Sequence, residues 1–468
     1  MKHTRSFRAD AEFFLKQYLN DDKAIAKNGF NKLVKITNKI NVGYVGSMVE
    51  HYRDDGIVLL QTKNIDAFFI NDTSLIKVTP EFHNQLKKSQ ITNEDILIAR
   101  SGSFGKASIY LDYNSINTSD IIIVEANKKI INPFFLVTYL NSKFGVNQMI
   151  RFSSGGLQGH VNLTILEELE VPIIDVTFQI KIEEIIKLSY DLKKSSKDLY
   201  SKAEIFLLQE IGLSKQLANS NLPLATSINV KSFNESFGVT GRLDAEYYQP
   251  KYEAIIEKIK SQKYDSLHNI VTITKSIEPG SDYYSDDEIG LPFMRVADYN
   301  KFGLSEPNKK LTLEFVKDNQ DKIDELKPQK GSILFSKDGS VGTAFHLRED
   351  FEGITSSAIL NLKVKNEKEI IPEYLTLALN SKLVQMQAER DAGGSIILHW
   401  RIGEIQNVIV PIIDYSKQQQ IAKLIEESFS LKKQSEHLLE VAKRAVEIAI
   451  EENEVIAMKY IDENCGII

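Results

Sequence analysis

The chain has 468 residues, of which 42% are hydrophobic and 26% are charged, and its formal net charge is −7. Its length predicts two or more domains, and its composition excludes long disorder and collagen-like folds. The negative charge argues against a protein that coats nucleic acid along its whole surface, although a few local Lys and Arg contacts stay compatible with it.

The N-terminal residues 1–10 are polar and charged, and no later apolar stretch is long enough to span a bilayer, so we expect a cytoplasmic protein. Cys465 is the only cysteine, which excludes intramolecular disulfides and a cysteine-rich zinc site. The eight histidines are scattered without the spacing of metal ligands, so no metal site is expected.

Residues 1–175 are predicted to form a mixed α/β domain, with short β-branched strands such as Ile121–Val124 separated by Gly and Asn turns. The segment Asn132-Pro-Phe-Phe135 resembles the Asn-Pro-Pro-aromatic loop of adenine methyltransferases but lacks its second proline. We interpret it as the start of a helix opened by Pro133.

Two segments of this domain are candidate contact sites. The first, which we call the glycine loop, is residues 100–106, and the second, the exit loop, is residues 153–162. Their side chains offer donors for phosphates and base edges, and the glycines permit a close backbone approach. The alternative readings are a hairpin turn and a plain connecting loop. The candidates are Arg100, Ser101, Ser103, Lys106, Ser153, Ser154, Gln158, His160 and Asn162.

Residues 176–215 are predicted to form a long helix, with Thr177 or the preceding Asp175 as its N-cap. Its apolar and small residues alternate at spacings of three and four, which is a heptad pattern. These residues are Ile182, Ile185, Ser189, Leu192, Ser196, Leu199, Ala203 and Phe206. A linker is expected at residues 216–240, because the glycines of Phe237–Gly241 follow no convincing strand.

Residues 241–414 repeat the first domain. The offset stays between 234 and 239 residues over five matched segments, which indicates a domain duplication. The pairs are Arg8–Phe14 with Arg242–Tyr248, Asp95–Ala107 with Ser332–Ala344, Asn141–Lys143 with Asn380–Lys382, Gly155-Gly156 with Gly393-Gly394, and Val171–Asp175 with Val410–Asp414.

The second copy has its own glycine loop, residues 337–343, and its own exit loop, residues 392–401. The candidates here are Lys337, Ser340, Thr343, Ser395, His399, Trp400 and Arg401. The copies agree in glycines and apolar positions but differ in polar side chains, as in Lys106 against Thr343 and Gln158 against Ile397. Two domains with one fold and different contact specificities would differ in this way.

Residues 415–460 are predicted to form a second heptad helix with the same alternation of small and large residues. Its seam is Ile421, Leu424, Ser428, Leu431, Ser435, Leu438, Ala442 and Ala445. Each helix could pack on its own domain, but the matching register favours pairing of the two. If the halves are related by a pseudo-twofold axis, the helices are antiparallel. About 30 residues then make a rod of roughly 45 Å, against the ~34 Å of one DNA turn.

The chain carries no recognisable enzyme motif. A phosphate-binding Gly-Lys-Ser/Thr loop, a His-Glu-x-x-His helix and a Gly-x-Ser-x-Gly elbow are all missing from the sequence. A non-catalytic protein is therefore expected.

The order of mixed domain, heptad helix, mixed domain and heptad helix resembles the specificity subunits of type I restriction-modification systems along essentially the whole chain. Pro411-Ile-Ile-Asp414 followed by Gln418-Gln-Gln-Ile-Ala422 looks like a framework segment of that family, and so does Arg242–Pro250. The first copy departs modestly, with Phe178–Ile182 in place of the glutamine run.

The resemblance implies two α/β target-recognition domains, separated by antiparallel coiled-coil helices, that each read one half of a split asymmetric DNA site. It also implies two methyltransferase subunits that methylate adenine with S-adenosylmethionine, and restriction subunits that use ATP and Mg²⁺ on the same double-stranded DNA. Those cofactors would belong to the partners. Two other readings stay open: a coiled-coil adaptor that reads no DNA, and a fused enzyme, which would need methyltransferase motifs.

Overall fold

The computed structural model describes residues 10–27, 29–100, 105–112, 114–153, 161–213, 228–285, 289–394 and 397–466. The chain divides into two compact units, of which the first is Met1–Lys194 with Leu431–Ile468 and the second is Ser195–Ser430. Both boundaries pass through the long helices α6 (Val176–Glu210) and α16 (Tyr415–Glu451). Each unit therefore combines one mixed domain with a part of both helices.

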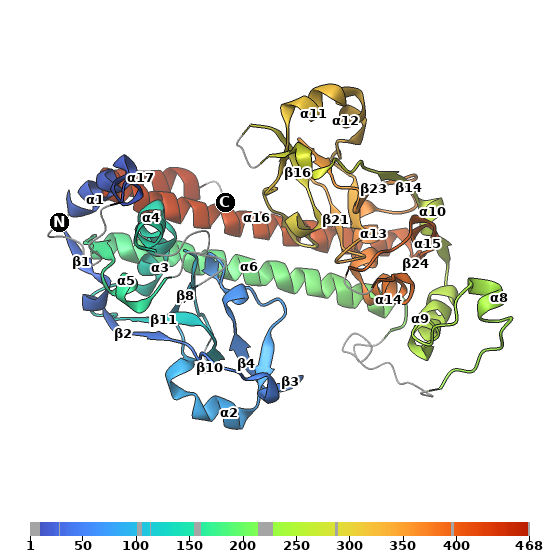
Figure 1. The fold of residues 1–468 in the computed structure, drawn as a ribbon, viewed down its shortest axis with the longest axis horizontal. Coiled ribbons are helices and arrows are strands. Elements are labelled where there is room, and N and C mark those ends of the chain that lie inside the picture. Colours follow the sequence, from blue (N-terminus) through green and yellow to red (C-terminus); the bar gives the residue numbers. More distant parts are fainter. Residues whose placement is uncertain are drawn as a thin grey trace. The chain divides into compact units, whose positions relative to one another are not determined.

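The first unit contains α1 (Lys16–Lys27), α2 (Pro80–Gln85), α3 (Pro133–Asn141), α4 (Lys143–Phe152), α5 (Leu163–Glu167), α17 (Glu454–Cys465), β1 (Phe30–Lys32), β2 (Thr37–Val42), β3 (Tyr52–Arg53), β4 (Ile57–Leu60), β5 (Phe68–Phe69), β6 (Ile76–Val78), β7 (Gln90–Ile91), β8 (Ile96–Ala99), β9 (Ala107–Ile109), β10 (Ile116–Thr118), β11 (Ile121–Ala126) and β12 (Glu170–Pro172). Figure 1 shows its strands between the helices α3 to α6 and the helix α2.

The main sheet of the first unit has the order β2-β11-β8-β9-β5 and is antiparallel except for the β5–β9 pair. Its central strands are continuous runs of Ile, Leu and Val because both faces are covered. Ile122 and Ile98 belong to the cluster that includes helix α3, whereas Leu97 and Ile123 face a second cluster with Leu60. A second sheet, β3-β6-β4-β10-β7, supplies that other layer.

The second unit contains α8 (Phe237–Thr240), α9 (Pro250–Lys260), α10 (Leu267–Ile270), α11 (Leu313–Asp318), α12 (Gln320–Leu326), α13 (Pro372–Asn380), α14 (Lys382–Asp391), α15 (Ile402–Gln406), β13 (Tyr264–Ser266), β14 (Val271–Lys275), β15 (Tyr284–Ser285), β16 (Leu291–Met294), β17 (Tyr299–Asn300), β18 (Gly303–Leu304), β19 (Lys310–Leu311), β20 (Ile333–Ser336), β21 (Ala344–His346), β22 (Ile354–Thr355), β23 (Ile359–Val364) and β24 (Ile409–Pro411).

The duplication in the sequence is a duplication of structure. The sheet β14-β23-β20-β21 matches β2-β11-β8-β9, and the sheet β15-β19-β16-β22 corresponds to the second sheet of the first unit. The hairpin register also repeats, because Ile96 pairs with Ile109 and Ile333 pairs with His346. Helices α3 and α13 both begin with a proline, Pro133 and Pro372, which confirms the helix-start interpretation of Asn132–Phe135.

The helices α6 and α16 pair in antiparallel fashion within each unit. In the first unit the Oγ atoms of Ser189 and Ser435 lie 2.9 Å apart. In the second unit the Oγ atoms of Ser196 and Ser428 are 3.2 Å apart. Lys417 Nζ also lies 3.2 Å from Glu210 Oε1. The heptad seams therefore meet in each unit, as the sequence predicted.

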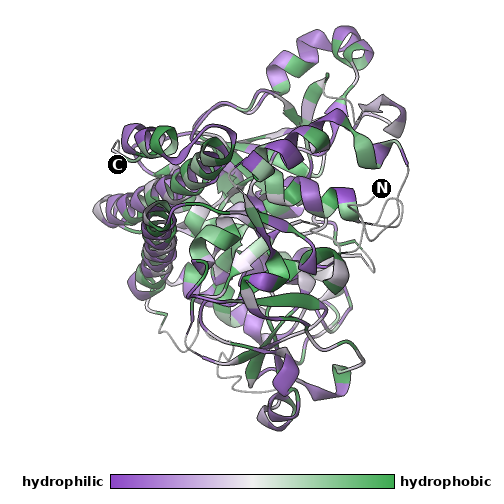
Figure 2. Cartoon of the chain, turned by 90° about the vertical axis from the view of Figure 1, so that its left-hand side faces the viewer, coloured by the Kyte–Doolittle hydropathy of each residue, from purple (hydrophilic) through white to green (hydrophobic). Residues whose placement is uncertain are grey.

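The same helices also pack on the mixed domains. Ile182 and Ile186 share a buried cluster with α3, and Ile421 and Ile425 share one with α13. The heptad stripe thus serves both to pair the two helices and to pack each helix on a mixed domain. Hydrophilic residues cover much of the helix surface visible in Figure 2.

Two segments differ from the sequence-based expectation. Helix α16 ends at Glu451, and Asn453 caps a separate helix α17, so residues 415–460 are not one helix. Within the expected linker, Phe237–Thr240 form the short helix α8. No helix among the described residues combines the length and the apolar character that a membrane crossing requires.

Candidate nucleic-acid interface

In each copy the first residue of the glycine loop lies beside a residue at the C-terminal end of the exit loop. In the first unit, Val161 N donates to Arg100 O at 3.3 Å. In the second unit, Trp400 N donates to Lys337 O at 2.7 Å. The two bonds join equivalent positions of the glycine loop and the exit loop. Residues about 60 positions apart in sequence are therefore brought together at the same place in each copy.

The cations of the first glycine loop each meet an aspartate. Arg100 Nη1 lies 3.0 Å from Asp120 Oδ1, and Lys106 Nζ lies 2.6 Å from Asp66 Oδ1. Burial would raise the pKa of the Asp66 carboxyl, but the hydrogen bond and charge of Lys106 outweigh it and hold that pKa below its usual value. All four side chains are partly exposed, so each pair can open toward an incoming anion.

Several candidates cannot be placed. Ser101, Ser103, Ser154, Gln158, His160 and Ser395 lie outside the described residues. Of the remaining exit-loop candidates, Ser153 donates its hydroxyl to Ile150 O at 2.7 Å. Asn162 accepts from Ile165 N at 2.9 Å as the N-cap of α5, and its side chain is exposed. Asn162 therefore has a structural role whether or not it also contacts a ligand.

The second glycine loop is a tight turn between β20 and β21. Thr343 N donates to Ser336 Oγ at 2.9 Å, and Thr343 Oγ1 donates to Ser340 O at 3.2 Å. Gly105 and Gly342 occupy the same place in the two copies with φ of +80° and +81°. A side chain at either position would strain the backbone, so these glycines are required by the turn itself.

Lys337 and His399 both contact Asp338. Lys337 Nζ forms an ion pair with Asp338 Oδ2, and His399 Nδ1 lies 2.9 Å from Asp338 Oδ1. The Lys337 side chain is only 15% exposed, whereas that of His399 is 64% exposed. His399 is thus the more accessible of the two to a ligand.

The structure corrects the prediction that Trp400 is a contact residue. Its side chain is 1% exposed and its ring centroid lies 5.8 Å from that of Phe335, so it belongs to the core of the second unit. A single tryptophan in a polar loop suggested a contact residue because the sequence does not show that the loop folds back onto strand β20. Arg401 stays exposed and caps α15 through its backbone N–H, which donates to Glu404 Oε2 at 3.1 Å.

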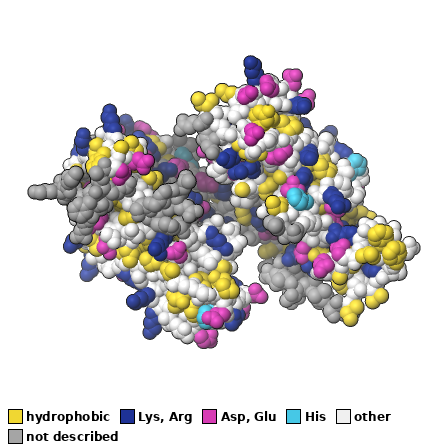
Figure 3. Space-filling view, in the orientation of Figure 1, with side chains coloured by type: hydrophobic (Ala, Val, Ile, Leu, Met, Phe, Trp, Pro, Cys, Tyr) yellow, Lys and Arg dark blue, Asp and Glu magenta, His cyan; other side chains and the backbone are white. Residues whose placement is uncertain are grey.

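One further cation belongs to this surface. Lys275, at the end of β14, lines an open hollow together with Lys337, Asp338, His399, Trp400, Arg401 and Ile402. Sequence reasoning missed Lys275 because only the pairing of β14 with β23 brings it near the loops. On the face drawn in Figure 3, Lys and Arg side chains are interspersed with acidic ones in both units.

Comparison with known proteins identifies the repeated domain. The family model of the type I restriction modification DNA specificity domain matches residues 18–200 and again residues 263–441. The type I restriction enzyme EcoBI specificity subunit of Escherichia coli is 24% identical over 213 residues, which are 45% of this chain and 42% of that protein. The match thus spans less than half the length of this curated relative.

Two solved structures are similar over most of the chain. The S subunit of a type I restriction-modification system from M. genitalium has 14% identity and a TM-score of 0.38, with 90% of this chain and 94% of that chain covered. The HsdS subunit from Thermoanaerobacter tengcongensis has 14% identity and a TM-score of 0.29, with 91% and 96% covered. Because the family model matches most of the chain, once in each copy of the repeat, this protein belongs to the family of type I restriction-modification DNA specificity domains.

Proposed function

We propose that this chain is the non-catalytic DNA-recognition subunit of a type I restriction-modification complex. Each unit would read one half of a bipartite, asymmetric site in double-stranded DNA. The observation that carries this proposal is the backbone bond that joins the start of the glycine loop to the end of the exit loop in both copies, from Val161 N to Arg100 O and from Trp400 N to Lys337 O. The same backbone bond in both copies, between segments whose polar side chains differ in sequence, supports two half-site readers with one frame.

The cations of this surface could exchange an aspartate partner for a DNA phosphate. Arg100 and Lys106 are held by carboxylates on a partly exposed surface, where an ion pair contributes only about 0–1 kcal/mol. A DNA phosphate can therefore replace Asp120 or Asp66 at little cost. The aspartates would hold the cations ready and limit binding to DNA of the wrong shape or sequence.

The remaining parts of the proposal concern the partners. The paired helices would set the spacer between the half-sites. Two methyltransferase subunits would dock on the helical region, and restriction subunits would join them. S-adenosylmethionine, ATP and Mg²⁺ would then be bound by those subunits, and this chain would contribute specificity alone in the cytoplasm.

The test is co-expression with the cognate methyltransferase subunit in a host that lacks adenine methylation, followed by genome-wide mapping of N6-methyladenine. A single bipartite motif is expected. A chimera whose residues 100–106 and 153–162 are replaced by those of a relative with another site should change one half of the motif only. Methylation that is absent, or that persists when this chain is omitted, would instead support an adaptor that reads no DNA.

A further inference from the structure

His346 is a buried histidine whose nitrogens lack hydrogen bonds. It ends strand β21, and its side chain is 9% exposed. Among the residues that the structure describes, neither Nδ1 nor Nε2 has a hydrogen-bond partner. Buried polar atoms are almost always satisfied in folded proteins, so an imidazole without hydrogen bonds is a group that a bound ion would satisfy.

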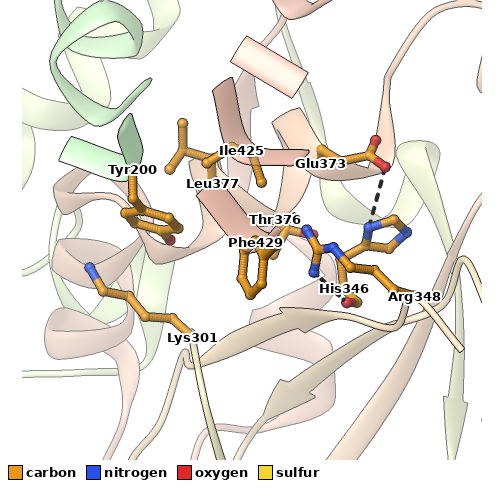
Figure 4. Close-up of a pocket in the computed structure, with 9 residues that line it drawn as sticks. All are labelled: Tyr200, Lys301, His346, Arg348, Glu373, Thr376, Leu377, Ile425 and Phe429. Carbon is orange, nitrogen blue, oxygen red and sulfur yellow. Dashed lines mark hydrogen bonds and ion pairs between the residues drawn. The ribbon is translucent and has the colours of Figure 1, made fainter. Parts of the chain in front are cut away.

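Two carboxylates face this imidazole. Glu373 lies in the first turn of α13, and its Oε1 is 3.4 Å from His346 Nδ1. Glu426 lies on α16, and one ligand atom from each of the three side chains falls within 4.8 Å of the others. Figure 4 shows His346 and Glu373 turned toward each other beside a pocket that Arg348 and Phe429 also line.

The 3.4 Å separation fits a shared ion better than a direct hydrogen bond. Hydrogen bonds between nitrogen and oxygen have lengths of about 2.7–3.2 Å. Two ligands that are each about 2.1 Å from a tetrahedral ion are about 3.4 Å apart. An ion that contacts His346 Nδ1 and Glu373 Oε1 can thus be accommodated without a large movement of either side chain.

Arg348 places a positive charge beside the three proposed ligands. Its Nη2 and Nε lie 2.9 and 3.2 Å from the same oxygen of Glu426, Oε1, so its contact with Glu426 uses one of the two carboxylate oxygens. The guanidinium also stacks 3.6 Å from the Phe429 ring centroid, so it is fixed in place. Arg348 would orient a ligand carboxylate, as outer partners of metal ligands commonly do.

The first copy of the repeat lacks the whole set. The position of His346 is Ile109, and the position of Glu373 is Phe134. With the offset of the matched helix starts, Glu426 corresponds to Lys187, whose Nζ lies 5.0 Å from the Phe134 ring centroid. The three polar residues of the second copy are therefore replaced in the first copy by two apolar residues and a lysine.

We propose that the second unit binds one divalent transition-metal ion of the zinc class through His346, Glu373 and Glu426. One imidazole with two carboxylates suits Zn²⁺ or Co²⁺ better than Ca²⁺ or Mg²⁺, which prefer oxygen ligands only. The ion would join strand β21 to helices α13 and α16 within this unit. It would be a structural site, independent of DNA and of the partner subunits.

The test uses the full chain, freed of any affinity tag, stripped with a chelator and titrated with Co²⁺. We expect one ion per chain, with the visible absorption of low-coordinate cobalt and displacement of the signal by Zn²⁺. Zn²⁺ should also raise the melting temperature. Glu373→Gln and His346→Ile, which introduces the residue of the first copy, should each weaken binding at least tenfold.

The matched control is His268→Ala, which removes an exposed histidine of the same unit and should leave Co²⁺ binding unchanged. Circular dichroism verifies that each variant folds. If His346→Ile does not fold, Co²⁺ binding by Glu373→Gln tests the proposal. Wild-type binding that is absent, or that equals the binding of folded Glu373→Gln, would overturn the proposal and leave a water molecule as the occupant of the cavity.

Discussion

Ser189 and Ser435 contact each other reciprocally across the helix pair of the first unit. Ser189 Oγ lies 3.0 Å from Ser435 O, Ser435 Oγ lies 2.8 Å from Ser189 O, and the two hydroxyl oxygens are 2.9 Å apart. Both side chains are buried, and these bonds give each buried hydroxyl a hydrogen-bond partner. The small side chains let the backbones approach closely enough for these bonds.

Substitutions at Ser189 should separate the two effects. Ser189→Ala removes one hydroxyl and should lower the free energy of unfolding by about 1 kcal/mol. Ser189→Leu must also force the helices apart and should lower it by about 1–3 kcal/mol more. Urea denaturation of the purified chain measures both. Leu188→Ala, at an exposed position on the same helix, serves as the control, and a Leu188 effect as large as that of Ser189→Leu would contradict the argument.

Asn380 pairs with the edge of the main sheet in the second unit. Its Oδ1 accepts from Ala344 N at 2.9 Å, and its Nδ2 donates to Ala344 O at 2.8 Å. Asn141 makes the same two bonds to Ala107 at 3.2 and 2.7 Å. The side-chain amide thus acts as an extra strand residue in each copy.

Asn380→Ala should therefore leave both backbone groups of Ala344 without a protein partner and lower the free energy of unfolding by about 2 kcal/mol. Asn141→Ala should have a similar effect on the first unit. Chemical denaturation followed by hydrogen exchange of the Ala344 amide tests this. Asn366→Ala is the control at an exposed position. An unchanged exchange rate at Ala344 in Asn380→Ala would show that the amide is dispensable.

The sequence predicted those features that depend on periodicity or repetition. The Ser189 and Ser428 positions follow from heptad spacing, and the equivalence of Asn141 and Asn380 follows from the internal repeat. Features that depend on contacts between distant segments were not predicted. Trp400 reads as a polar-loop residue until the loop is seen to pack on Phe335.

The proposed metal ligands show the same limit. His346, Glu373 and Glu426 are separated by 27 and 53 residues, which matches no short ligand motif. They meet because strand β21 packs against α13, and α16 contacts both through Ile425 and Phe429. The short strands of the outer sheets, such as β3 and β7 with two residues each, are also too brief to give an alternation pattern.

His83 should make the stability of the first unit depend on pH. Burial lowers the pKa of its imidazole, and Asn117 Nδ2 lies 2.9 Å from Nδ1, which can accept a hydrogen bond only while it is unprotonated. The unfolded chain, with a His pKa of about 6.5, then binds more protons than the folded chain as the pH falls below that value. Stability should decrease as the pH is lowered through this window.

Melting of the wild type and His83→Gln between pH 7 and pH 5 checks this expectation. The variant should lose less stability over the window than the wild type, because its side chain does not titrate. His268→Gln, at an exposed position, should follow the wild type. Parallel pH profiles for all three proteins would exclude His83 as a source of the dependence.

Removal of an aspartate that holds Arg100 or Lys106 should change DNA affinity in the opposite direction from removal of the cations. Replacing Arg100 and Lys106 together with Ala should weaken binding of the assembled complex to its site and reduce the slope of log affinity against log salt by about one per lost phosphate contact. Asp66→Asn keeps the size of the side chain but frees the charge of Lys106, so it should strengthen binding to DNA of any sequence and thereby reduce discrimination.

Fluorescence anisotropy with the cognate site and with a scrambled duplex, over a series of salt concentrations, measures both effects. Lys129→Ala is the control, because this exposed lysine follows the far end of β11, opposite to Ile121, which pairs with Ala99 next to the glycine loop. If the double variant keeps the affinity, salt slope and site choice of the wild type, residues 100–106 do not contribute to DNA binding. If Asp66→Asn alone leaves discrimination intact, Asp66 positions Lys106 without competing with phosphate.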